Sequence, residues 1–329
     1  MLSAELSRAF HLMSLICACL VVGIHMPSYG KNMDVVLADG FCRIAVPFFF
    51  FASGFFLSGR INCQNWWRAA VFKRLTTLLS PFFIWTSLFL ILPFLYGGRV
   101  CPLNVVDVAS FYGLNIFSFP GVVPYWFIRT LFVLCLLSKL FVKFCVGRPR
   151  LWLVFLTLGW LLFSPWHDVH PLGIAPLRRI LPIDSIFFFN CGICVRVWRL
   201  YDIVTYPRML FLGIVGLILM ALKIAFSLHE YSFYWIPGAF SVPFLICGLI
   251  GLLSYVRFSI KYSIYSFPIY ILHSIFLQFF GMVFGRFISV GSRTEYVLIY
   301  FFTILSCIFV AVIIKRVSSR CYNILFGGR

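Results

Sequence analysis

Charged residues are scarce in this chain, and acidic ones are the scarcest. Of 329 residues only 11% are charged, with nine aspartates and glutamates against 27 lysines and arginines. A typical soluble domain contains about 25% charged residues, so the composition excludes an ordinary soluble globular fold. The shortage of acids also leaves no pair of carboxylates inside an apolar segment, and such a pair would favour a proton- or ion-coupled transporter.

Several other features are missing. The chain contains no soluble domain, internal repeat or low-complexity stretch, and its first apolar segment lacks a small-residue cleavage site. We therefore predict one integral membrane domain over residues 1–329, with the first segment as a membrane span rather than a signal peptide. Cys191 and Cys194 in "NCGIC" have the spacing of a metal or redox pair, and "HDVH" at 167–170 has polar ligands, but neither has further ligands nearby. Helix packing and a solvated loop explain them better, and no metal site is expected.

Apolar residues dominate the remaining sequence, at 62% of the chain with 41 phenylalanines. A bilayer core about 30 Å thick needs roughly 20 apolar residues per helix, and a spanning segment must satisfy its own backbone hydrogen bonds. The sequence thus predicts an all-α polytopic membrane bundle of about ten transmembrane helices. The expected segments are 9–27, 42–59, 72–96, 125–145, 151–165, 182–198, 208–227, 237–256, 262–284 and 296–314.

The distribution of basic residues predicts the orientation. Eighteen of the 27 lysines and arginines lie at segment ends on the same side as both termini, whereas nine lie on the other side together with seven of the nine acids. Because basic loops stay in the cytosol, both termini are expected to be cytosolic. The basic residues are spread over many loop ends rather than gathered in one patch, so the bilayer is the expected partner and nucleic acid is not.

Polar side chains inside the spans are candidates for function because they are costly in lipid. His25 lies near the exterior end of the first segment, two residues before Pro27, and Ser14 and His11 fall on nearly the same helical face. His273 lies in the middle of the segment 262–284. The sequence pattern alone also fits structural roles. His25 can be a ring at the membrane interface, and His273 can be a structural hydrogen-bonding group.

Five stretches, in this order, resemble the acyltransferase 3 family of bacterial membrane acyltransferases. "LICACLVVGIH" is similar to the first helix of that family, which ends in an essential histidine, here His25. "RIAVPFFFFASGFFLSGR" resembles the second helix, so Arg43 and Ser53 match its pattern. The third, fourth and late helices are represented by "FKRLTTLLSPFFIW", "YWFIRTLFVLCLLSKL" and "FPIYILHSIFL", whose matching residues include Lys73, Arg74, Trp126 and His273.

Two positions depart from the family pattern. Members commonly have an arginine eleven residues before the histidine, where this chain has Ser14. A second basic residue is usual three positions after Arg74, where this chain has Thr77. These losses indicate either a branch that manages without the two arginines, with Arg43 compensating, or a chain of impaired activity.

The resemblance implies an enzyme of the bacterial inner membrane that moves an acyl group, most often acetyl, from cytosolic acyl-CoA to a hydroxyl of an envelope polysaccharide or its lipid-linked precursor. By that resemblance His25 is the catalytic residue, Lys73 and Arg74 bind the donor, and Arg43, Ser53, Trp126 and His273 bind substrate. No metal is implied. A flippase for a lipid-linked glycan and a non-catalytic family member are the alternatives.

Overall fold

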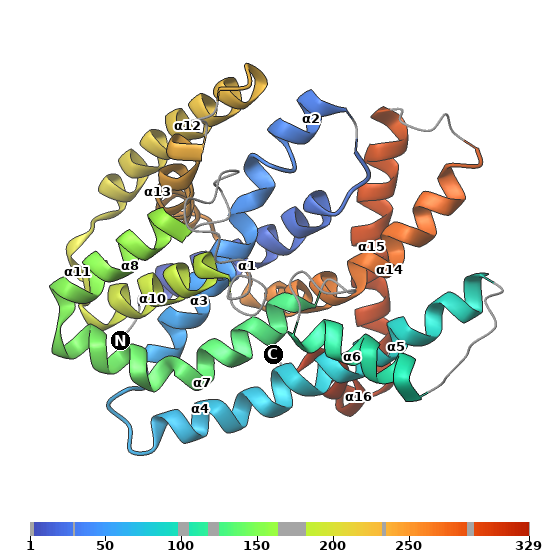
Figure 1. Cartoon of the computed structure of the whole chain (residues 1–329), viewed down its shortest axis with the longest axis horizontal. Helices are drawn as coiled ribbons and strands as arrows, with labels where there is room; N and C mark the ends of the chain where they lie inside the picture. The colour runs from blue at the N-terminus through green and yellow to red at the C-terminus, as the bar shows by residue number, and fades with distance from the viewer. Residues whose placement is uncertain are drawn as a thin grey trace. The chain divides into compact units, whose positions relative to one another are not determined.

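The computed structural model describes residues 3–28, 30–97, 105–117, 125–163, 182–231, 235–287 and 293–328 (Figure 1). Within these ranges the regular elements are all helical and no strand occurs, which confirms the predicted all-α class. The chain divides into two compact units. One comprises Met1–Ala52 and Arg199–Arg316, and the other Ser53–Trp198 and Val317–Arg329.

The first unit contains the N-terminal helix and the helices of residues 199–316. Its elements are α1 (Ala4–Ile24), α2 (Lys31–Val36), the 3₁₀ helix η1 (Phe41–Ile44), the start of α3 (Ala45–Ser58), α11 (Leu200–Ile203), α12 (Tyr206–Leu228), α13 (Trp235–Ser254), η3 (Ile260–Tyr265), α14 (Ser266–Phe284) and α15 (Arg293–Val317).

Helix α1 packs against α13 and α14 through one apolar face. Ser3 caps its N-terminus, since the hydroxyl accepts a hydrogen bond from the Leu6 amide at 3.2 Å. Ala9, Met13 and Cys17 are fully buried at spacings that return to one side of the helix. The helix ends at Ile24, shortly before Pro27, because the residues preceding a proline leave the helical conformation.

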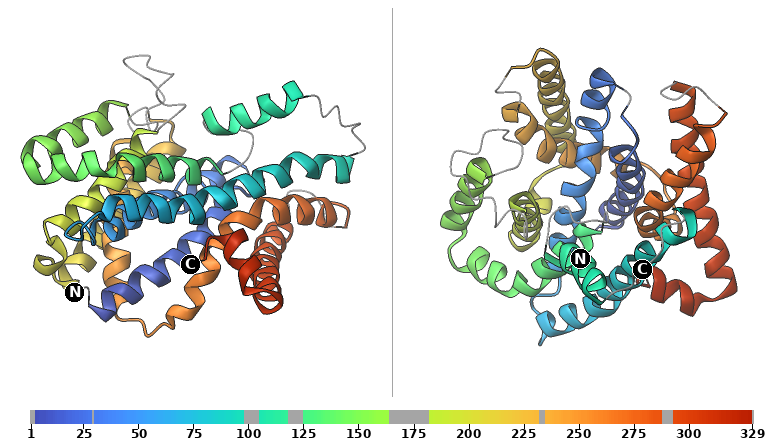
Figure 2. Two further views of the ribbon diagram at one scale, coloured as in Figure 1. Left: turned by 90° about the horizontal axis from the view of Figure 1, so that it is seen from below. Right: turned by 45° about the vertical axis from the view of Figure 1, so that its right-hand side comes forward.

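Helices α12 and α13 run alongside each other at very short range (Figure 2). Glycines make this approach feasible: a Cβ added to Gly248 would lie 2.1 Å from the Cα atom of Gly213. Gly216 and Gly251 face the neighbouring backbone or side chain just as tightly. Small residues let two backbones touch within a membrane, where close van der Waals packing holds helices together.

The second unit contains the remaining helices. They are the end of α3, α4 (Trp66–Arg74), the π-helix η2 (Leu75–Leu79), α5 (Ser80–Gly97), α6 (Val105–Phe117), α7 (Trp126–Gly147), α8 (Pro149–Phe163), α10 (Ile183–Val197) and α16 (Ser319–Phe326). Gly54 of α3 lies against α10, since a Cβ there would be 2.0 Å from the Phe189 carbonyl oxygen.

Each of the ten predicted segments overlaps a described helix, but neither the count of about ten spans nor the cytosolic side of the termini is confirmed. Seven helices of the described chain are long and apolar enough to cross a membrane. Helices α8 and α10 have 15 residues each, about 22 Å at 1.5 Å per residue, which is shorter than the apolar core of a bilayer. The segment expected at 72–96 is divided among α4, η2 and α5.

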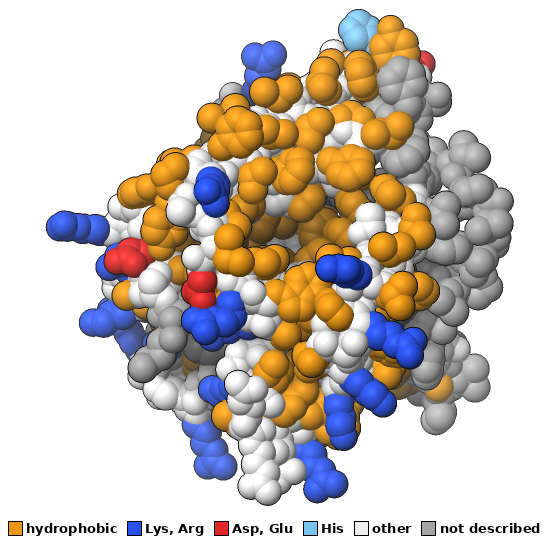
Figure 3. Space-filling model, turned by 90° about the vertical axis from the view of Figure 1, so that its left-hand side faces the viewer, with side chains coloured by type: hydrophobic (Ala, Val, Ile, Leu, Met, Phe, Trp, Pro, Cys, Tyr) orange, Lys and Arg blue, Asp and Glu red, His pale blue; other side chains and the backbone are white. Residues whose placement is uncertain are grey.

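The surface agrees with a multi-pass membrane protein. Hydrophobic side chains form a broad area on the face shown in Figure 3. On α12, the large apolar residues Phe211, Ile214 and Ile218 are exposed. A helix with such a stripe is suited to contact lipid.

Replacing Gly248 with alanine tests the packing of α12 on α13. We expect the free energy of unfolding in detergent to fall by about 1–3 kcal/mol, because the added methyl group meets backbone rather than a movable side chain. Gly281→Ala in α14 is the matched control, since a Cβ there meets nothing within 4 Å and alanine favours a helix. Equal stability of the two variants would contradict the close approach.

Candidate active site

His25 lies at the carboxyl end of α1, and the residue as a whole is exposed. It is the C-cap of the helix, and its amide donates to the Val22 carbonyl at 3.1 Å. A pocket next to it is lined by residues that include Gly23, Met26, Met33 and Tyr296. A histidine that ends a helix in this way can meet a reactant.

His273 lies against His25 and is held from within its own helix. The two ring centroids are 5.1 Å apart and the planes are tilted by 34°. His273 is 0% exposed, its Nδ1 is 2.6 Å from the Tyr270 carbonyl oxygen, and its Nε2 is 3.2 Å from the Ser274 hydroxyl. A carbonyl only accepts, so we assign the proton to Nδ1, and Nε2 accepts from Ser274. The His273 ring is therefore buried and held in place by these two hydrogen bonds.

The two rings of this pair differ in how readily they can exchange a proton. Two imidazolium ions at this separation would repel each other strongly in surroundings of low polarity. Because burial disfavours a charge on His273, His25 is the member of the pair that can more readily exchange a proton. The structure therefore brings together two predicted site residues that are far apart in the sequence.

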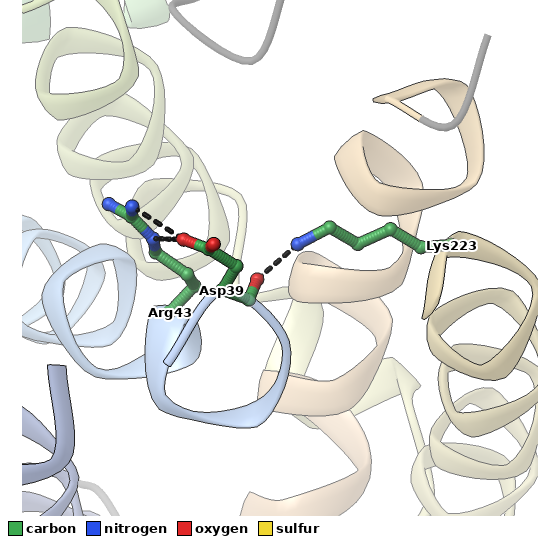
Figure 4. Close-up of polar contacts among 3 residues, drawn as sticks. All are labelled: Asp39, Arg43 and Lys223. Atoms are coloured by element: carbon green, nitrogen blue, oxygen red, sulfur yellow. Dashed lines mark hydrogen bonds and ion pairs between the residues drawn. The ribbon is translucent and has the colours of Figure 1, made fainter. Parts of the chain in front are cut away.

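Arg43 belongs to the same unit and lies in η1, directly after the turn that follows α2. It is exposed, and both its Nη2 and Nε donate to Oδ1 of Asp39, at 2.8 and 3.2 Å (Figure 4). Burial, as the larger cause, and the positive charge of Arg43 both lower the pKa of His25 from its ordinary value. Gly40 makes the turn tight, since a Cβ there would lie 2.3 Å from the Val36 carbonyl oxygen.

Lys223 is part of this cluster, although its sequence position did not single it out as a site residue. The structure places it inside α12, where it is 4% exposed and donates to the main-chain carbonyl of Asp39 (Figure 4). The available signal was its position within the apolar run "LILMALKIAFSL". A lysine in such a run is costly and needs a specific partner. Asp39 was likewise missed, because its role depends on the turn.

Four predicted site residues belong to the second unit. Ser53 is half-buried in α3, and Trp126 is half-buried at the start of α7, with its ring 6.4 Å from that of Phe127. Lys73 is exposed and Arg74 half-exposed in the last turn of α4, immediately before the π-helix η2. π-helical turns often occur at functional sites, and cations are favourable at a helix C-terminus.

The C-terminal helix α16 packs against the π-helix η2 and against α5. The Trp85 indole donates to the Leu325 carbonyl at 2.9 Å, and its ring stacks on Phe326. Gly327 has φ +73° and lies so close that a Cβ would be 2.2 Å from the Thr77 carbonyl oxygen. Helix α16 therefore stabilises the segment that follows Lys73 and Arg74.

Ser14 and Thr77, the two residues that depart from the family pattern, have ordinary structural surroundings. Ser14 donates to the Phe10 carbonyl at 2.8 Å within α1, and neighbouring His11 bonds the Ser263 hydroxyl of η3 at 3.0 Å. The Thr77 hydroxyl is buried in η2 without a hydrogen-bond partner among the described residues. Neither position supplies a positive charge.

The part of the chain that the structure describes holds no group of three or more histidine, cysteine or acidic side chains. The "HDVH" stretch lies outside the described residues. Cys194 of "NCGIC" lies with its sulfur 3.5 Å from that of Cys145 in α7, so the pair meets another helix in the apolar interior.

Comparison with known proteins gives one match. Residues 8–316, nearly the whole chain, match the model of the acyltransferase 3 family, described as an acyltransferase domain. No curated protein and no solved structure matches the chain.

The hydrogen bonds of His273 predict how its variants will behave. In His273→Leu the Ser274 hydroxyl loses its acceptor, so we expect the free energy of unfolding in detergent to fall by about 1–3 kcal/mol. His273→Asn keeps a donor near the Tyr270 carbonyl and should lose less. His229→Leu is the control, because that histidine is exposed. Equal stability of the Leu and Asn variants at position 273 would contradict the assigned role.

Proposed function

Because this chain belongs to the acyltransferase 3 family and is a membrane acyltransferase, we propose that it acylates sugar hydroxyls. The donor is cytosolic acyl-CoA, most simply acetyl-CoA, and the acceptor is an envelope polysaccharide or its lipid-linked precursor. The seven long apolar helices among the described residues support a multi-pass protein, which we assign to the bacterial inner membrane.

The observation that carries this proposal is the contact between His25, an exposed residue at the end of α1, and the buried, internally bonded His273. A neutral imidazole can take a proton near physiological pH because its ordinary pKa is about 6.5. A residue at a helix end can meet the substrate, and a fixed neighbour limits the orientations that its ring adopts. General base catalysis needs both properties.

The transfer proceeds by attack of the acceptor on the thioester. His25 takes the proton of the sugar hydroxyl as the oxygen bonds to the thioester carbonyl carbon. The carbon–sulfur bond then breaks, the ester is released, and the departing CoA thiolate takes the proton from the imidazolium. Alternatively, His25 accepts the acyl group first as an acyl-imidazole and passes it to the sugar. Both routes use the same ring.

Arg43 is suited to the negative charge that develops during this reaction. The thioester oxygen becomes an oxyanion as the carbonyl carbon turns tetrahedral, and a fixed cation nearby lowers the energy of that state. The guanidinium is already oriented by Asp39 and acts on the His25 ring. We assign acceptor binding to Ser53 and Trp126.

Lys73 and Arg74 are proposed to bind the phosphates of the CoA donor. The two side chains occupy the last turn of α4, and adjacent cations match the charge of phosphate groups. In the predicted orientation they face the cytosol, where acyl-CoA is available. His25 lies about 31 Å along α1 from its first residue, at 1.5 Å per residue, so the acyl group must travel through most of the membrane.

His25→Ala tests the catalytic assignment. We expect transfer to fall by about 10²–10⁴-fold, the usual contribution of a general base, while the protein still inserts into the membrane. The readout is the amount of alkali-labile acyl ester on the glycans of cells expressing each variant, measured by mass. His229→Ala is the matched control, since His229 is also an exposed C-cap of a long helix.

Normal ester levels in the His25→Ala cells would overturn the assignment. Purified wild-type protein that releases no CoA in the presence of acceptor would favour the non-catalytic family member. Movement of a lipid-linked sugar across vesicles without acylation would favour the flippase.

Lys73→Gln and Arg74→Gln test donor binding. Loss of either charge should raise the KM for acyl-CoA by about tenfold, because phosphate binding weakens while the chemical step is unchanged. The effect should shrink as salt is added, since salt screens exposed charges. Arg60→Gln, also an exposed cation of the same unit, is the control. A change in kcat with an unaltered KM would contradict the role.

A further inference from the structure

Lys223 is a buried cation in the middle of an apolar membrane helix. It lies in α12, which is otherwise almost entirely apolar around it, and it is 4% exposed. An ammonium group in such surroundings is costly unless its charge is satisfied within the protein. Its partners therefore show what the lysine does.

The ammonium reaches the turn that precedes Arg43. Nζ donates to the main-chain carbonyl of Asp39, and Figure 4 shows the side chain extending from α12 toward the turn. The stem crosses α13 at Gly238, where an added Cβ would lie 2.9 Å from the lysine Cδ and 3.1 Å from its Cγ. Gly238 thus leaves room for the stem to pass.

Asp39 connects the lysine to Arg43. Its carbonyl oxygen accepts from Lys223, and its carboxylate accepts from Nη2 and Nε of Arg43. The turn is also held by its own backbone, with the Asp39 amide bonded to the Asp34 carbonyl and the Cys42 amide to the Leu37 carbonyl, both at 2.9 Å. A group that fixes the main chain of Asp39 also fixes the carboxylate that orients the guanidinium.

A second lysine offers a natural comparison. Lys31, at the start of α2, pairs with Glu230, just beyond the end of α12, but their side chains are 60% and 73% exposed. The Lys31 ammonium holds the pKa of Glu230 below its ordinary value. Exposed pairs of this kind contribute little to stability, whereas a buried donor whose removal leaves a carbonyl unsatisfied contributes more. Of these two contacts, the buried one is suited to hold the turn.

We propose that Lys223 is a positioning residue for acyl transfer, which acts through Asp39 to hold Arg43 in its working orientation. This role rests on the proposed function, because it assumes that Arg43 stabilises the reacting thioester. Lys223 itself does not contact substrate. Its effect on the reaction must therefore disappear when Arg43 is absent.

The test is a double-mutant cycle on the full-length protein in detergent or vesicles. Lys223→Met keeps an unbranched stem of similar length and removes the ammonium. We expect kcat to fall by about 10- to 100-fold, as misplacement of a catalytic group commonly does. In the Arg43→Ala background the same change should cost less than about twofold further, since both variants remove one interaction. Lys31→Met should stay within about twofold of wild type.

Hydrogen exchange of the amides of residues 37–43 gives a readout that does not depend on activity. Exchange there should be faster in Lys223→Met and unchanged in Lys31→Met. If Lys223→Met does not fold, Gly238→Ala is tested instead. Its added Cβ displaces the Lys223 side chain while the lysine itself is not substituted. We expect the same effects at smaller size.

Losses that multiply in the double variant, or unchanged exchange in the turn, would overturn this inference while leaving the proposed function intact. Wild-type protein that transfers no acyl group, with faster exchange in Lys223→Met, would instead overturn the proposed function and with it the catalytic role of the turn.

Discussion

Polar groups inside an apolar bundle must find their partners within the protein, and this constraint organises the candidate site. His273 bonds the Tyr270 carbonyl and the Ser274 hydroxyl of its own helix, and Lys223 bonds the carbonyl of Asp39. In the second unit, the Trp160 indole donates to Asp184 at 2.7 Å. Each contact fixes a side chain that would otherwise be costly in lipid.

Of the two histidines in the cluster, His25 is the one in an exposed position. Its ring packs against His273, whose two ring nitrogens are both hydrogen-bonded. Burial and the positive charge of Arg43 lower the pKa of His25. A reactive group held among fixed neighbours loses little entropy when substrate arrives, and its electrostatic surroundings are already arranged. The membrane, rather than a cavity in a soluble core, provides the low polarity in which these interactions are strong.

Close helix packing determines where these groups meet. The glycines of α12 and α13 allow the two backbones to touch, and Gly238 provides the space through which the Lys223 stem passes. A bulkier residue at any of these positions would separate the helices or deflect the lysine. The same principle applies in the second unit, where Gly327 permits α16 to sit against the Thr77 carbonyl.

Much of this protein could be predicted from its sequence, because long apolar runs in a bilayer can only be helices. The all-α class, the helical segments, the family and the candidate residues His25 and His273 all followed from local patterns. The crossing count was less certain, since α8 and α10 are only 15 residues long. The contact between His25 and His273, and the link from Lys223 through Asp39 to Arg43, depend on tertiary packing. Residues far apart in the chain become neighbours only when helices pack against one another. The spacing of residues along a single helix does not determine which helices pack together.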